Sequence, residues 1–172
     1  MKSLFRSALR LVDRLDPPET VQAHCDIPCG IYDPHLAQIA ALTCIRMNQL
    51  INDLGDAPGP GDKQKNDAWH NSLARYVAVK EEHAELVKRE VRIIWGDYFK
   101  PEHLEKHKDL HQTVWNIMKL GSTVRQQVNM DAAQGLLAEV QKFAEAFWST
   151  KDAKTQRVPS RQAVGGEIVI PA

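Results

Sequence analysis

The sequence has few cysteines, no long apolar run and no excess of either charge. Its 172 residues include 3 cysteines, an odd number that argues against a disulfide scaffold. No apolar stretch approaches the roughly 18–20 residues that a membrane-spanning helix needs. Lysine plus arginine and aspartate plus glutamate both number 22, so neither nucleic acid nor an anionic membrane is expected as a partner. The 43% of hydrophobic residues suffice for one globular core.

Residues 3–15 form a short, basic, amphipathic segment that is expected to be helical. The segment lacks the continuous apolar stretch and the small-residue cleavage pattern of a secretory signal. Pro17 and Pro18 then stop any helix. Two interpretations stay open, a docking helix of the mature protein and a removable leader, and the cytoplasm is the expected location.

Four later segments have apolar residues at three- and four-residue steps, which is typical of amphipathic helices. Short connections between such helices predict an all-α fold, an antiparallel four-helix bundle. Gly96 to Pro101 are expected to form a turn, with Pro101 opening the third helix and Asp131 near the N-cap of the fourth. The segments run from just after Pro34 to Leu54, with a stripe that begins at Leu36 and Ile39, then over 65–94, 101–120 and 131–148.

Three parts are expected along the chain: a leader over 1–23, the bundle with the segment before it over 24–150, and a tail over 151–172. The tail is polar after Thr150 and ends in Gly-Gly-Glu-Ile-Val-Ile-Pro-Ala. No partner pattern stands near it, so it is expected to be largely disordered or docked at a subunit boundary.

The segment that carries chemistry is His24-Cys25-Asp26-Ile27-Pro28-Cys29. Pro28 and Pro34, together with Gly30, force an irregular path over residues 24–34. If His24 is an internal residue, the segment offers two thiolates and an imidazole, for which zinc is the default metal, but a fourth ligand and the usual Cys-x2-Cys spacing are missing. A thiol–disulfide pair is also conceivable, although Cys-x3-Cys is not the common redox spacing.

Cleavage between Ala23 and His24 changes the ligand set. The new amine, the backbone nitrogen of Cys25 and the Cys25 thiolate can then chelate one metal ion. The Cys29 thiolate completes a square plane, and the His24 imidazole can bind above it. Planar nitrogen and sulfur ligation suits Ni(II) or Cu(II) rather than zinc, and the electron-rich donors make Ni(III) accessible.

Residues 24–34, His-Cys-Asp-Ile-Pro-Cys-Gly-Ile-Tyr-Asp-Pro, resemble the nickel-binding hook of nickel superoxide dismutases. Residues 95–101, Trp-Gly-Asp-Tyr-Phe-Lys-Pro, resemble a second recurrent segment of that family. The resemblance implies an antioxidant enzyme that disproportionates superoxide to dioxygen and hydrogen peroxide by Ni(II)/Ni(III) cycling. It also implies one nickel ion per subunit, a homohexamer, and a protease that exposes His24.

The same resemblance assigns roles to individual residues. The nickel ligands are His24 through its amine and imidazole, Cys25 through its thiolate and amide, and Cys29 through its thiolate. Four further residues, Asp26, Pro28, Gly30 and Tyr32, match positions that shape the hook and restrict access to the metal. Pro28 is a candidate for a cis peptide bond, and Tyr32 for a hydrogen bond to a bound oxygen species or water.

Two positions depart from the family pattern. A glutamate in the first helix and an arginine in the second orient the axial imidazole in better-known members, and Ala40 and His83 stand at the matching positions here. Such partners fix the orientation and tautomer of a metal-bound imidazole. We therefore predict that His83 contacts the His24 imidazole.

Other conspicuous residues have simpler interpretations. His103, His107 and His111 stand at steps of four on one predicted helix and are interpreted as a solvated or interface face rather than a metal site. Cys44 is expected in the core, and the run from Lys80 to Glu82 on an exposed helix face. The 4 tryptophans are expected in the core or at subunit contacts.

Overall fold

The computed structural model of the protein describes residues 29–59 and 61–172. Ile31–Ala172 form one unit, and Cys29 and Gly30 belong to the unit that precedes it. The expected leader lies outside the described residues, as do His24, Cys25, Asp26 and Pro28, so the cis peptide predicted at Pro28 stays a prediction.

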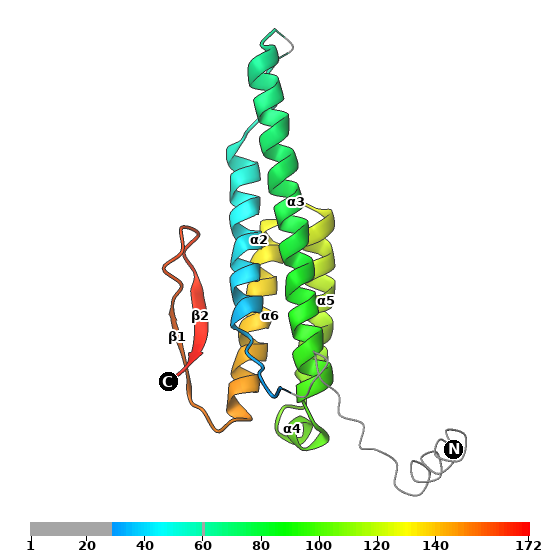
Figure 1. The fold of residues 1–172 in the computed structure, drawn as a ribbon, viewed down its shortest axis with the longest axis vertical. Helices are drawn as coiled ribbons and strands as arrows, with labels where there is room; N and C mark the ends of the chain where they lie inside the picture. The colour runs from blue at the N-terminus through cyan, green and yellow to red at the C-terminus, as the bar shows by residue number, and fades with distance from the viewer. Residues whose placement is uncertain (1–28, 60) are drawn as a thin grey trace, which may run out of the picture. The chain divides into compact units, whose positions relative to one another are not determined.

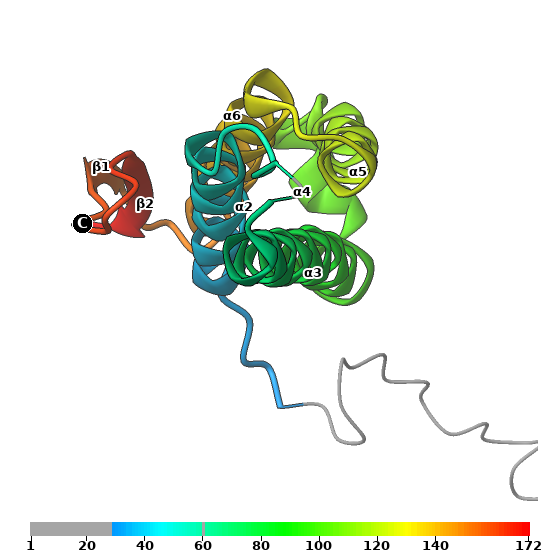
Figure 2. The same ribbon diagram turned by 90° about the horizontal axis from the view of Figure 1, so that it is seen from above.

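Four long helices form the bundle that the sequence predicts (Figures 1 and 2). Helix α2 packs against α3 and α6, and α5 packs against the same two helices from the other side. The amino-terminal half of α3 extends beyond α5 and α6 in Figure 1. The helices are α2 (His35–Asp53), α3 (Lys63–Ile93), α5 (Leu110–Gln126) and α6 (Met130–Ser149).

The sequence predicts one continuous third helix, and this prediction is wrong. The chain forms two helices there, α4 (Pro101–Lys106) and α5. His107 leaves the helical region, with φ −119° and ψ 69°, and ends α4. Pro101 does open α4, as predicted. The predicted turn before it is partly a π-helix, η1 (Ile94–Tyr98), closed by the Phe99 amide on the Ile94 carbonyl at 3.3 Å.

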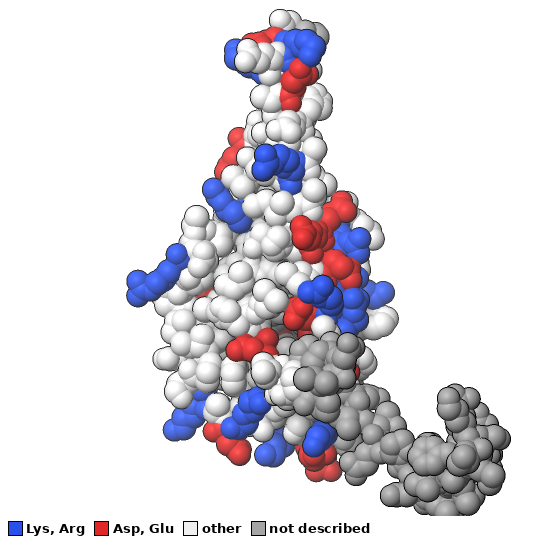
Figure 3. Space-filling view, in the orientation of Figure 1, with Lys and Arg blue, Asp and Glu red and all other residues white. Residues whose placement is uncertain are grey.

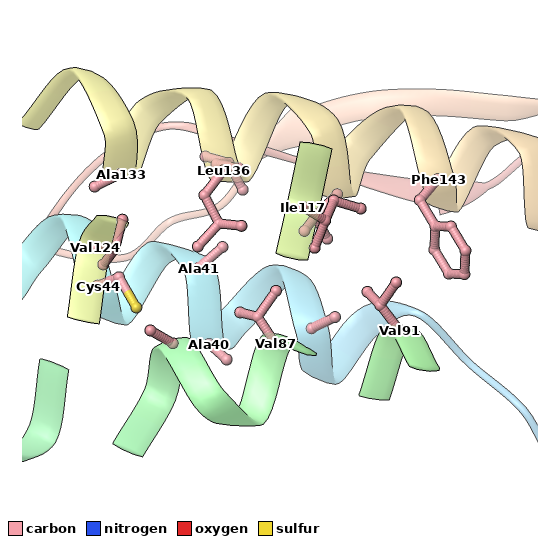
Figure 4. Packing of buried hydrophobic residues seen from close by; sticks show 14 of the residues in the cluster. Ala40, Ala41, Cys44, Val87, Val91, Ile117, Val124, Ala133, Leu136 and Phe143 are labelled. Carbon is pink, nitrogen blue, oxygen red and sulfur yellow. The ribbon is translucent and has the colours of Figure 1, made fainter. Parts of the chain in front are cut away.

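The core lies between the four long helices (Figure 4). Helix α6 supplies large side chains on the predicted stripe, among them Leu136, Phe143 and Phe147. The stripe predicted for α2 is only partly correct: Ile39 packs against the core, but Leu36 is 46% exposed, and mostly small residues face inward. Small side chains let α2 lie close to α3 and α6 at once. The inward set on α2 is Ala37, Gln38, Ala40, Ala41, Leu42, Cys44, Ile45 and Asn48.

The expectation that the tail over residues 151–172 is largely disordered is wrong, because this segment folds into a β-hairpin. Strands β1 (Thr155–Pro159) and β2 (Glu167–Pro171) pair antiparallel, with Arg157 opposite Val169. Gly165 and Gly166 precede β2 at φ +74° and +75°, a backbone region that glycine adopts without strain. Val169 is buried against the bundle, so this part of the chain adds to the fold.

The surface of the bundle is uneven in charge. In the view of Figure 3, charged side chains gather at the two ends and along α3, and much of the face over α2 is uncharged. Among the helices within the described residues, none has the length and apolar character that crossing a bilayer requires.

Candidate metal centre

The described part of the predicted hook is the stretch from Cys29 to Pro34. Cys29 is half-buried, and Gly30 has φ +67°, which a residue with a side chain rarely adopts. The glycine therefore permits a left-handed backbone conformation directly after the predicted ligand. Asp33 accepts a hydrogen bond from the His35 amide at 2.7 Å, and α2 begins there.

Tyr32 is the predicted site residue that the structure places most clearly. Its side chain is half-buried and packs against the core cluster. Its ring lies 5.5 Å from the ring of Tyr98, with the two planes tilted by 51°. Such a separation is within the range of favourable aromatic pairs. Tyr98 closes η1 and belongs to the second segment that resembles the family, so the two segments meet at this pair.

Tyr98 is itself held firmly by α6 and α4. The Thr150 hydroxyl donates its proton to the Phe147 carbonyl at 2.6 Å, so the Tyr98 hydroxyl donates to the Thr150 oxygen at 2.7 Å. The Tyr98 ring packs on Phe147 at 4.7 Å and stacks on His103 at 5.6 Å. These contacts give Tyr32 a firmly held packing surface within the described part of the predicted hook.

The three histidines at steps of four have separate partners. His103 accepts a hydrogen bond from the Lys100 amide at 3.1 Å, and His111 accepts one from the Trp95 indole at 3.0 Å. His107 donates to the Ser149 hydroxyl at 2.6 Å, because that hydroxyl donates to the Ala146 carbonyl. Within residues 29–59 and 61–172, no three histidine, cysteine or acidic side chains gather as a metal site would require.

Ala40 and His83 lie on the two helices that pack side by side. Ala40 is buried, and the Nδ1–H of the half-buried His83 donates to the Val79 carbonyl at 2.8 Å. That bond leaves Nε2 of the neutral ring as the acceptor, an arrangement common among histidines that serve metal sites. One turn away, Met47 of α2 shares a surface pocket with Val79 of α3, so His83 lies on the side of α3 that faces α2.

Cys44 and Lys80 are buried together between α2 and α3. Burial raises the pKa of Cys44 to about 12, so its side chain is a thiol at neutral pH and not a metal-binding thiolate. Lys80 is only 2% exposed, and the expectation that it lies on an exposed face is wrong. Burial lowers the pKa of Lys80, and its Nζ donates to the carbonyls of Val124, Arg125 and Gln127 at the end of α5.

Sequence reasoning missed the roles of Tyr98 and Lys80, and the signal differed between them. Lys80 falls on the same helical stripe as Ala84, Val87 and Val91, a spacing that could have indicated an inward side chain. Nothing in the local sequence indicates that Tyr98 contacts Tyr32, because the two residues are 66 positions apart.

Known proteins resemble both the sequence and the fold. A family model described as nickel-containing superoxide dismutase matches residues 19–151. The nickel superoxide dismutase of Streptomyces coelicolor is 35% identical over 144 residues, which cover 83% of this chain and all of the relative. The enzyme from Streptomyces seoulensis is 33% identical with the same coverage.

Two solved structures extend the likeness to the backbone. A native nickel superoxide dismutase is 34% identical, with a TM-score of 0.61 over 74% of this chain and 99% of the solved one. A nickel-containing superoxide dismutase with ligation corresponding to the oxidized state is 31% identical, with a TM-score of 0.64 over 76% and 100%.

The helical fold and these matches place the chain in a class of all-α, metal-dependent oxidoreductases. The chain belongs to the nickel-containing superoxide dismutases. Its cofactor is nickel, and its substrate is superoxide.

Proposed function

We propose that this superoxide dismutase becomes active when a protease removes residues 1–23 and leaves His24 as the amino terminus. An uncut chain offers a peptide amide at His24, which is a poor ligand, whereas a free amine is a good one. The proposed ligands are the amine and imidazole of His24, the amide and thiolate of Cys25, and the thiolate of Cys29. Nickel held by these donors supplies reversible one-electron chemistry for superoxide.

The donor chemistry of the chain fits nickel. Of the 3 cysteines, Cys44 is buried as a thiol, which leaves Cys25 and Cys29 as thiolate donors. No competing group of three ligating side chains occurs in the described part of the chain. The single observation that carries the proposal is the Tyr32–Tyr98 contact, because it joins the chain just after Cys29 to the bundle.

Tyr32 is proposed to limit access to the metal and to donate a hydrogen bond to a bound oxygen species or ordered water. Tyr98 supports that role, since its ring is packed on Phe147 and its hydroxyl is tied to Thr150. Asp26 is proposed to shape the hook beside the ligands. Replacing Tyr32 by Phe removes the donor and keeps the ring, so turnover should fall while the nickel content is retained.

His83 is proposed to contact the imidazole of His24 in place of the family's charged pair. Its Nδ1–H is fixed on the Val79 carbonyl, so Nε2 is available to accept a hydrogen bond. His83→Ala should change the Ni(III) EPR spectrum and lower turnover, and His83→Gln should restore part of both. An unchanged spectrum and unchanged turnover in His83→Ala would exclude the contact.

The processing step is tested on protein from the native host. Amino-terminal sequencing should find His24 as the first residue, and metal analysis should find one nickel per subunit with a rhombic Ni(III) EPR signal. A chain that retains Met1 and still turns over superoxide with nickel bound would refute activation by cleavage. Stoichiometric zinc without turnover would refute the ligand assignment.

We also propose a homohexamer in the cytoplasm. Trp95 and Trp115 are 38% and 58% exposed, which suits subunit contacts better than an isolated subunit. Native mass spectrometry tests the assembly, since a monomer at micromolar concentration would exclude it. Cell fractionation tests the location, which rests on the character of residues 3–15.

A further inference from the structure

The C-terminal hairpin lies beyond the residues that match the family, which end at residue 151. It nevertheless packs on the bundle through β2, which lies next to α2 and α6 (Figures 1 and 2). The curated relatives are covered along their whole length by 83% of this chain. The hairpin therefore lies outside the residues matched by the family model, and its contacts call for a role of their own.

The register of the hairpin determines which backbone groups of β2 face away from β1. The Ser160 amide bonds the Gly166 carbonyl at 2.9 Å, and the Ala172 amide bonds the Lys154 carbonyl at 2.8 Å. Bonded pairs alternate in an antiparallel ladder, so the pair Arg157–Val169 between them is a non-bonded one. The amide and carbonyl of Val169 therefore point out of the hairpin.

Gln38 of α2 binds both of these outward groups. The Val169 amide donates to Gln38 Oε1 at 2.7 Å, and Gln38 Nε2 donates to the Val169 carbonyl at 3.0 Å. Gln38 is fully buried and Val169 is 1% exposed. The side chain of Gln38 thus takes the place of a neighbouring strand, and its amide group is satisfied only while the hairpin is docked or water replaces it.

A second glutamine ties the hairpin to α6. Gln141 Nε2 donates to the Glu167 carbonyl at 2.7 Å, two residues before Val169. Arg157 of β1 donates to Gln141 Oε1 at 3.1 Å and to Glu145 at 2.9 Å. The two glutamines have the same chemistry, but they hold different helices.

The hairpin follows the first half of α2. A Cβ on Gly166 would lie 3.1 Å from the Leu42 side chain, which places the start of β2 one turn beyond Gln38. The loop between the strands forms, with Ile39, Thr43 and Arg46, a cavity of about 180 Å³. The contacts therefore extend along α2 from Gln38 to Arg46.

The beginning of α2 has few other restraints of its own. Pro34 is its N-cap and supplies no side-chain hydrogen bond, and no acidic residue lies in the first turn. Unsatisfied amides at a helix start favour fraying, and Asp33 satisfies the first of these amides by accepting a hydrogen bond from His35 at 2.7 Å. Cys29 precedes the first residue of α2 by only six positions.

We propose that Gln38 is a positioning residue through which the C-terminal hairpin holds the first turns of α2, the point where the metal-binding segment joins the bundle. The proposal rests on the proposed role of residues 24–29 in binding nickel. It assigns Gln38 no contact with the metal or the substrate.

The test compares Gln38→Met with Gln141→Met in the full chain. Methionine keeps the size of the side chain and removes its hydrogen bonds. Hydrogen exchange is measured on the unprocessed, metal-free protein, and the rate of nickel loss to a chelator on the processed enzyme. In Gln38→Met, exchange at Val169 and at the first turns of α2 should rise about tenfold, as expected for two lost hydrogen bonds. Nickel loss should be about threefold faster, at the low end of effects seen when supporting residues are removed.

Gln141→Met is the matched control. It should speed exchange near Glu167, while the first turns of α2 and the rate of nickel loss stay within about twofold of the parent. Equal acceleration of nickel loss in both variants would overturn the proposal and make the hairpin a general stabiliser. Unchanged exchange at the start of α2 in Gln38→Met would overturn it as well. Hydrogen exchange is measured without metal, so it tests the role of Gln38 even if the proposed nickel ligands are wrong.

Discussion

The proposed metal-binding segment and the helical bundle are expected to use their residues in opposite ways. In residues 24–34 each proposed role depends on a donor atom or a backbone shape, as with the sulfur atom of Cys29 and the positive φ of Gly30. In the bundle, a residue contributes mainly by its volume and its place on a stripe, as Figure 4 shows for Leu136 and Ile117. A substitution of equal size should therefore abolish function in the segment and be tolerated in the core.

A cysteine of the proposed metal-binding segment can be compared with a cysteine of the bundle. Cys29 lies in the hook and is half-buried, whereas Cys44 is buried and its raised pKa of about 12 keeps it a thiol. Cysteine is thus proposed as a ligand in one region and is a small buried side chain in the other. Burial and the surrounding charge decide which.

Replacing Cys29 by Ser should have the largest effect on function. The variant loses a thiolate donor, so nickel binding and superoxide turnover should fall to background, measured by metal analysis and stopped-flow decay of superoxide. The melting temperature of the metal-free protein should stay within about 2 °C of the parent, because no core volume changes.

Cys44→Ala is the control for that experiment. It should keep nickel and turnover and lose the packing of one sulfur atom and the hydrogen bond from the Cys44 thiol to the Lys80 carbonyl, about 1 kcal/mol of unfolding free energy. Turnover in Cys29→Ser close to that of the parent would contradict the division between the two regions.

Phe143→Ala should have the largest effect on stability. The ring is fully buried and lies 5.6 Å from the Phe99 ring, so its removal should lower the free energy of unfolding by about 3–5 kcal/mol. Urea denaturation measures the change, with Val128→Ala, at a side chain 49% exposed, as the control. Protein that remains folded should keep its nickel EPR spectrum, and a lost spectrum would show that the core also sets the metal site.

The sequence predicted correctly those helices whose inward residues are set by regular local spacing. The stripe of α6 is correct because Leu136, Val140 and Phe143 are large, apolar and regularly spaced. The prediction of the inward residues of α2 was only partly correct, because alanine is found on buried and exposed helix faces alike. Only the proximity of α3 and α6 selects Ala37 and Ala41 for the interior. The break in the helix at His107 was not predicted, because neither proline nor glycine marks it in the sequence.

The hairpin and the surroundings of the hook depend on contacts between distant parts of the chain. Gln38 and Val169 are 131 positions apart, and a glutamine in a helical pattern ordinarily indicates an exposed position. Tyr32 and Tyr98 likewise meet only after the bundle has formed. The ligands of the hook can be proposed from the sequence because they are neighbouring donors, whereas the contacts around Tyr32 could not be foreseen.

Lys80→Met should give a smaller loss of stability than Phe143→Ala. The ammonium group of Lys80 satisfies carbonyls at the end of α5, so its loss leaves buried acceptors unpaired at a cost of about 1–3 kcal/mol. Hydrogen exchange should accelerate in the last turn of α5. Lys63→Met, whose side chain is 88% exposed, is the control and should change nothing measurable. A stability equal to that of the parent would show that water satisfies the carbonyls.

Glu85→Gln should have the smallest effect and should depend on pH. Glu85 accepts hydrogen bonds from Arg92 and Arg125, each at 2.8 Å, and chiefly the bond from Arg92 lowers the pKa of Glu85 below its ordinary 4.5. The folded state therefore holds the charged form more strongly than the unfolded state does, and this stabilisation is complete above pH 4.5 and is lost as pH falls through the folded pKa. Because the side chain is 41% exposed, solvent limits the loss of unfolding free energy at pH 7 to less than about 1 kcal/mol.

Urea denaturation should show that difference at pH 7 and none well below the folded pKa of Glu85. The control is Glu82→Gln, at an exposed position, which should leave the stability unchanged at both pH values. A difference that persists in acid would mean that Glu85 acts by packing α3 against α5 rather than by charge, and would place it with the volume-dependent residues of the bundle.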